Sequence, residues 1–133
     1  MNKSRVVLIA IVAVAGAFLA GLWLGGSGQS TAARDRDQAQ LRLNLERARV
    51  SMLHGRLELI SSNFGGASKQ FDAARAPLEA ARNDLNKAGR DAEATRVDAA
   101  LAALVQAQQM ALALDRNADA KVTEALGGLQ GIE

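Results

Sequence analysis

The 133-residue sequence has no cysteine and no tyrosine, and only one proline, one tryptophan and one histidine. Without cysteine the chain can form no disulfide, no thiolate metal site and no lipidated cysteine. With His54 as the only histidine, a two-histidine metal site is excluded, and we expect neither a metal nor a cofactor. Motifs for nucleophilic catalysis, phosphate binding and dinucleotide binding are also missing. We therefore predict no catalytic residues and no enzyme activity.

Charge is distributed unevenly along the chain. Lys3 and Arg5 precede a hydrophobic run, and the residues after that run carry 14 basic and 14 acidic side chains. The part of the chain beyond the run is therefore formally neutral, although the overall net charge is +2. A formally neutral domain gives no case for nucleic-acid binding, so we expect no nucleic-acid partner.

The hydrophobic run covers residues 6–24, which are 19 apolar or small residues without a charge. A helix of this length spans roughly 29 Å, close to the ~30 Å hydrocarbon core of a bilayer. We predict a single transmembrane helix that contacts membrane lipid, with residues 1–5 in the cytoplasm because basic residues favour that side. The protein would then lie in the inner (cytoplasmic) membrane. The alternative is a cleaved signal peptide, although its hydrophobic region is usually only ~7–15 residues long.

Small residues recur at every fourth position of this run, at Ala13, Ala17, Gly21 and Gly25. This spacing places them on one face of a helix, where they would let a second membrane helix approach closely. We predict this face as a possible dimer contact of the membrane helix. The alternative is that alanine and glycine are simply common in membrane helices.

After the anchor, the sequence predicts a Gly/Ser linker at residues 25–32 and an all-α extracytoplasmic domain at residues 33–130. The first helix of that domain, from about Ala33 to Ser61, carries two adjacent apolar rows. One row comprises Leu41, Leu45, Ala48, Met52, Gly55 and Leu59, and the other comprises Leu43, Val50, Leu53, Leu57 and Ile60. Two rows make a wide apolar face, so we expect more than one neighbour to cover this helix.

The remaining elements are also helical by their spacing. A glycine-containing turn at residues 61–66 is followed by a helix over residues 67–87, which Pro77 should kink. A third helix is predicted to start with Asp91 as its N-cap, and Asn117 is predicted to cap a short fourth helix. The last residues are rich in glycine, so we expect them to fray.

Six large side chains are expected to form the core of the helical hairpins. They are Leu41, Leu45, Met52, Leu53, Phe64 and Phe71. Charged residues three positions apart should pair on the outer helix faces. These pairs are Glu46 with Arg49, Asp72 with Arg75, Glu79 with Arg82, and Glu93 with Arg96.

One segment resembles a known repeat family. Its residues are Gly55, Phe64, Ala67, Phe71 and Ala74, at the spacing of a tetratricopeptide repeat (TPR). The resemblance implies that the glycine lies where two antiparallel helices pack closely. An ordinary antiparallel helical hairpin explains the same spacing.

The order of one anchor followed by Ala/Leu-rich hairpins is similar to that of bacterial membrane proteins described as uroporphyrinogen-III methyltransferase-like. The tryptophan and tyrosine typical of the TPR are replaced by Ser51 and Glu58, and no catalytic motif is carried over. This resemblance implies a helical interaction module on the outer face of a bacterial inner membrane.

Two functions follow from these observations. The first is a membrane-anchored protein-interaction or scaffold module that faces the periplasm and binds an unidentified protein. The second is a self-associating coiled-coil spacer or structural protein of the cell envelope. Gly55 and Pro77 weigh against a long uninterrupted coil.

Overall fold

The computed structural model describes the backbone of residues 3–133 and the side chains of residues 31–133. It contains the helices α1 (Lys3–Ile60), α2 (Phe64–Lys87), α3 (Asp91–Leu112) and α4 (Ala118–Gly128), and the described residues include no strand. The all-α prediction is thereby confirmed. The chain divides into two compact units, residues 1–37 and residues 38–133, and the hydrophobic core belongs to the second unit.

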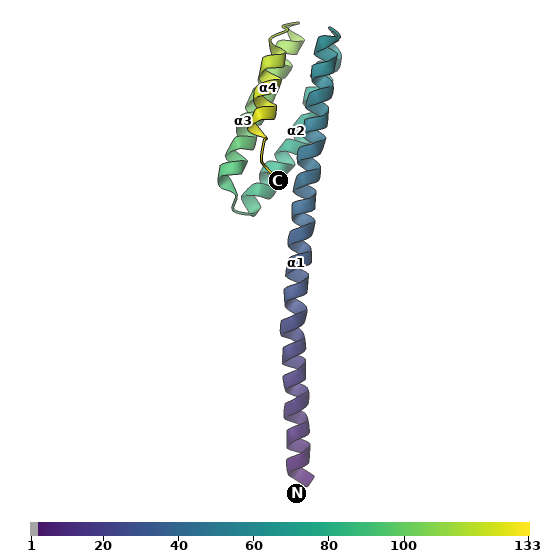
Figure 1. Cartoon of the computed structure of the whole chain (residues 1–133), viewed down its shortest axis with the longest axis vertical. Helices are drawn as coiled ribbons and strands as arrows, with labels where there is room; N and C mark the ends of the chain where they lie inside the picture. Colours follow the sequence, from purple (N-terminus) through teal and green to yellow (C-terminus); the bar gives the residue numbers. More distant parts are fainter. Residues whose placement is uncertain (1–2) are drawn as a thin grey trace. The chain divides into compact units, whose positions relative to one another are not determined.

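Within residues 38–133 the helices follow one another in antiparallel order (Figure 1). α2 packs against α3, and α3 packs against α4. The second half of α1 meets α2 where Gly55 lies against Phe71, and it meets α4 where Arg56 pairs with Asp119. This part of α1 therefore has two neighbours.

The contact between α1 and α2 is closest at Gly55. A Cβ atom added to this glycine would lie 2.2 Å from Cε1 of Phe71, a separation that real side chains do not reach. Phe71 is fully buried, and its ring occupies the space that any other residue at position 55 would need. The missing side chain thus lets the two helices approach, and this outweighs the lower helix propensity of glycine.

The first apolar row of α1 faces the core. Leu41, Leu45 and Met52 are buried there, as is Phe71 from α2. Two residues of the predicted core differ. Leu53 is 48% exposed because it belongs to the second apolar row, and Phe64 is only partly buried because it stands at the first turn of α2.

α2 begins at Phe64, before the two glycines that were predicted to lie in the turn. Asn63 is its N-cap, and the side-chain oxygen of Asn63 accepts a hydrogen bond of 3.1 Å from the backbone N–H of Gly66. Gly65 and Gly66 therefore lie in the first helical turn and do not form the predicted loop. The left-handed residue of the connection is Ser62, with φ of 59°. This cap explains why α2 starts earlier than predicted, because it satisfies a backbone donor that would otherwise have no partner.

The predicted Gly/Ser coil does not interrupt α1, and Pro77 does not end α2, which was predicted to continue to Lys87; the kink expected at Pro77 stays a prediction. α1 runs through residues 25–32, where the sequence predicts a coil. A glycine costs a helix only about 1 kcal/mol relative to alanine, and helix on both sides can override that cost because helix formation is cooperative. α2 continues past Pro77 to Lys87.

The predicted caps of α3 and α4 also need correction. Asp91 is the first helical residue of α3, and the N-cap is Arg90, whose side chain makes no capping hydrogen bond. The carboxylate of Asp91 still favours this end of the helix through the helix dipole. Asn117 is the N-cap residue of α4, but its side chain does not cap either. Asp115 instead accepts a hydrogen bond of 2.9 Å from the backbone N–H of Asn117.

The buried face of α3 is composed mostly of alanine. Its buried residues are Ala94, Val97, Ala100, Ala103, Leu104, Ala107 and Ala111. Small side chains let helix axes approach one another closely, because packing distance depends on the residues at the contact. α3 can therefore lie between α2 and α4 with few large side chains of its own.

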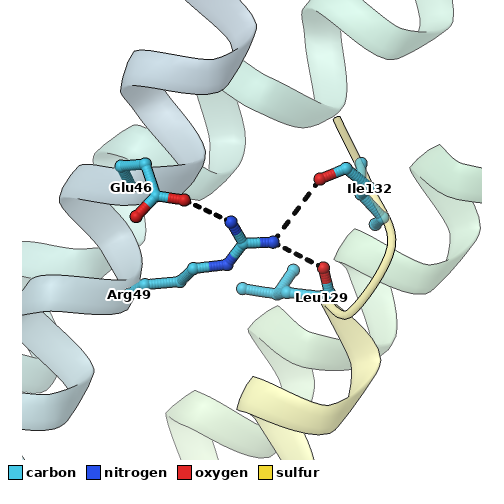
Figure 2. Close-up of polar contacts among 4 residues, drawn as sticks. All are labelled: Glu46, Arg49, Leu129 and Ile132. Atoms are coloured by element: carbon cyan, nitrogen blue, oxygen red, sulfur yellow. Dashed lines mark hydrogen bonds and ion pairs between the residues drawn. The ribbon is translucent and has the colours of Figure 1, made fainter.

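The C-terminal residues are packed and do not show the fraying that their glycines predict. Leu129 is fully buried and Ile132 is 1% exposed. Arg49 of α1 donates hydrogen bonds to the carbonyl oxygens of Leu129, at 2.7 Å, and Ile132, at 3.4 Å (Figure 2).

Two arginines of the α3 region donate hydrogen bonds to further backbone oxygens of this segment. Arg90 binds the oxygen of Glu133, at 2.8 Å, and Arg96 binds that of Gln130. Charged donors on backbone oxygens form strong hydrogen bonds, which fix this segment although three glycines lie nearby.

Only some of the charge pairs follow the local spacing. The predicted pairs Glu46 with Arg49 and Asp72 with Arg75 are confirmed. The other two differ, because Arg82 pairs with Asp98 of α3 and Glu93 pairs with Arg90. Arg90 with Glu93 is still a local pair three residues apart, whereas Arg82 with Asp98 joins α2 to α3 and depends on the tertiary packing.

Among the residues whose side chains are described, no helix is long and apolar enough to cross a membrane. The predicted transmembrane segment at residues 6–24 lies outside those residues. The same holds for the predicted dimer contact, which comprises Ala13, Ala17, Gly21 and Gly25. Both stay predictions.

We expect Gly55→Ala to destabilise the domain by about 1–3 kcal/mol, because the new methyl group would overlap the Phe71 ring. Urea unfolding monitored by circular dichroism measures the loss. Gly65→Ala is the matched control, since nothing lies within 4 Å of a Cβ at that helical position, and it should cost no stability. The cost of Gly55→Ala should shrink in a Phe71→Leu background. Equal stability of the two alanine variants would contradict the close contact.

A second prediction concerns Glu93. The hydrogen bonds from Arg90 lower the pKa of Glu93 below its ordinary value, and burial opposes this only partly. A lowered pKa in the folded state contributes stability above the unfolded pKa of about 4.3, and this contribution is lost as the pH falls through the folded value. Glu93→Gln should therefore reduce stability at pH 7 by about 0.5 kcal/mol, typical of a partly exposed ion pair, and by less at pH 3.

Urea midpoints at the two pH values check this prediction. Glu79→Gln is the control, because Glu79 is exposed and has no ion pair among the described residues. It should leave the stability at pH 7 unchanged, because it removes no ion pair. A Glu93→Gln profile that runs parallel to the unmodified one would show that the Arg90 contact does not hold in solution.

Candidate interaction surface

The described part of α1 carries a row of large apolar side chains on its outer face. We call this row the α1 apolar stripe, and it consists of Leu43, Val50, Leu53, Leu57 and Ile60. These side chains are between 43% and 76% exposed. Single exposed apolar residues are normal on a protein surface, but a continuous row of them typically marks a contact site.

The position of the stripe follows from the geometry of the helix. The buried row, from Leu41 to Leu59, is turned toward α2 and the C-terminal segment, and its residues are at most 6% exposed. The stripe lies on the side of α1 turned away from the buried row, because its members are offset from that row by one or two positions and each residue advances the helix by about 100°. More than one neighbour covers α1, as predicted, but the second row is left uncovered within residues 38–133.

Basic side chains border the stripe on both sides. Arg47 and His54 lie on one flank, and both are exposed. Arg42, Arg49 and Arg56 lie on the other flank. Glu46 is the one carboxylate within the row, and it pairs with Arg49 (Figure 2).

The arginines of the second flank differ in the contacts that their side chains make. Arg56 donates a hydrogen bond of 2.6 Å to Asp119 of α4. This bond raises the pKa of Arg56, with burial acting in the opposite direction, so the side chain stays charged at any physiological pH. Arg49 is bound to Glu46 and the C-terminal carbonyl oxygens. Arg42, like Arg47 on the first flank, has no ion pair within residues 31–133.

An open groove runs beside the stripe between α1 and α2. It has a volume of about 440 Å³, and its lining includes Val50, Arg47, Ala73 and Pro77. Pro77 has no N–H group, so it cannot donate the usual helical hydrogen bond to the carbonyl oxygen of Ala73, four residues earlier. The carbonyl oxygen of Ala73, a residue that lines the groove, is therefore left without its usual helical partner.

His54 is the only histidine of the chain, and it belongs to α1. No group of three or more histidine, aspartate or glutamate side chains within residues 31–133 is placed to hold a metal ion. Glu58, the nearest carboxylate along the helix, instead accepts a hydrogen bond of 2.6 Å from Asn63 at the start of α2. His54 is exposed and lies on the border of the apolar stripe.

The stripe was not predicted as a site from the sequence. Leu53 was predicted to lie in the core, and the second apolar row was expected to be covered by a neighbour. A signal was present, because the second row repeats at intervals of seven, three, four and three residues, which is the spacing of a coiled-coil seam. Two further exposed leucines, Leu112 and Leu114, lie at the end of α3 and form no such row.

No protein-family model, curated protein or solved structure that was compared with this chain matches it. The surface itself is therefore the basis for a functional proposal.

Proposed function

We propose that this chain is a single-pass membrane protein whose helical domain binds another protein on the outer side of the cytoplasmic membrane. The observation that carries the binding role is the α1 apolar stripe. Five large apolar side chains in one row, at least 43% exposed, are costly to leave in water without a contact to make.

The membrane placement is supported by the sequence. The 19 uncharged residues at 6–24 fit the thickness of a bilayer. Lys3 and Arg5 precede them, and the next charged residue is Arg34, so the basic flank favours the cytoplasm. In this arrangement the helices of residues 38–133 lie outside and present the stripe to proteins of the cell envelope.

A TPR-like arrangement of the hairpin is part of this proposal. It is supported by the contact of Gly55 with Phe71, since the resemblance implies a close approach of two helices at these positions. TPR hairpins serve as scaffolds that bind protein segments along their helix faces.

Membrane insertion and orientation can be tested together, because the absence of cysteine allows single cysteines to report without background. We expect the protein in a bacterial host to resist extraction from membranes at alkaline pH. In spheroplasts, a membrane-impermeant maleimide should label Ala92→Cys at the exposed start of α3. Asn2→Cys should be labelled only after lysis.

The reverse labelling pattern would place the domain in the cytoplasm. Recovery of the intact chain in the soluble fraction would contradict the anchor. A shorter chain that begins after residue 24 and is released from spheroplasts would show a cleaved signal peptide.

A further inference from the structure

The spacing of the α1 apolar stripe is that of a helix that meets another helix. Leu43, Val50 and Leu57 are seven residues apart, and Leu53 and Ile60 continue a second series with the same period. The two series fit the a and d positions of a heptad, in which only Glu46 is polar. The stripe is about 26 Å long, since it extends over 17 residue steps of ~1.5 Å each. An occupant of matching length is a helix of about five turns.

The heptad register also assigns the flanking residues. Arg47 and His54 occupy the e positions, and Arg42, Arg49 and Arg56 occupy the g positions. These positions select the partner of a coiled coil, because their side chains face those of the opposite helix. Both flanks carry basic residues and neither carries an acidic residue, so the charges favour a partner with carboxylates along both sides of its apolar seam.

A second copy of this chain lacks such carboxylates. In a parallel pair, each g residue faces the e residue five positions later in the partner, so Arg42 would face Arg47 and Arg49 would face His54. In an antiparallel pair, g faces g and e faces e, which again sets basic residues against each other. The two copies of Glu46 would add a carboxylate at a position that favours apolar residues. Like charges at these positions disfavour self-pairing.

We propose that the α1 apolar stripe binds an amphipathic helix of another protein, with apolar residues at its a and d positions and acidic residues at its e and g positions. This rests on the proposed function and names the chemistry of the partner. The apolar stripe supplies the buried contact. Arg42 and Arg47, which have no ion pair among the described residues, supply the selection by charge.

The test uses two designed helical peptides of about three heptads, both with leucine at a and d. One peptide has glutamate at every e and g position, and its control has lysine there. Binding to the full-length chain in zwitterionic-lipid nanodiscs is measured by fluorescence anisotropy. The glutamate peptide should bind at least about tenfold more tightly, and its advantage should shrink as salt screens the charges.

Two sets of variants separate the apolar and the charged contributions. Leu57→Glu should remove binding of the glutamate peptide. Leu112→Glu, the same change at a leucine of similar exposure outside the stripe, should not affect it. Both leucines are at least 60% exposed, so the fold should tolerate both changes, and circular dichroism verifies this. The double variant Arg42→Glu with Arg47→Glu should reverse the preference and favour the lysine peptide.

Several results would overturn the inference. In one such result neither peptide binds to the chain, and in another the two peptides bind equally tightly. In a third, the glutamate peptide still binds to the Leu57→Glu variant. Sedimentation adds one more, because a concentration-dependent dimer that Leu57→Glu dissolves would show that a second copy occupies the stripe. Failure of the membrane placement is a separate outcome. A chain found in the soluble fraction would be tested with the same peptides in solution, and its charge preference would still decide the inference.

Discussion

The contact between Gly55 and Phe71 determines how α1 is presented. Because a Cβ at position 55 would lie 2.2 Å from the Phe71 ring, only glycine allows α1 and α2 to approach at this point. The approach turns the row from Leu41 to Leu59 into the core, and since the two apolar rows share one rigid helix, it also turns the second row outward. The exposed surface is in this sense a consequence of the buried contact. Arg49 and Arg56 also hold α1 in this orientation by binding the C-terminal segment and α4.

Helix content and most helix limits could be predicted from the sequence, because apolar spacing, capping residues and turn residues act locally. Leu41, Leu45, Met52 and Phe71 follow the 4-3 spacing and are buried. The errors arise where distant contacts decide. The C-terminal glycines suggest fraying, but arginines from α1 and from the start and body of α3 bind the carbonyl oxygens there. Arg82 lies three residues from Glu79 but pairs with Asp98, which packing brings within reach.

The candidate surface was harder to predict, for a physical reason. Periodicity shows that two faces of α1 are apolar, but it does not show how many neighbours are available to cover them. Met52 lies in the first apolar row and Leu53 in the second, and both rows have helical spacing. Only the placement of α2 and α4 leaves Leu53 exposed and Met52 buried. The arginines of this helix are present in the sequence, but they can be assigned to the borders of a surface only once the exposed row between them is known.

The alanine-rich face of α3 has a consequence for how this domain can change. A buried alanine loses no rotamer freedom on folding, so the interior is ordered at little entropic cost. Its side chain can become smaller only by replacement with glycine. Any larger residue must fit into an interior that is already packed as densely as an organic crystal. Substitution of these alanines by smaller residues and by larger residues is therefore restricted. Substitutions on the outer helix faces leave this packed interior unchanged and are tolerated more readily.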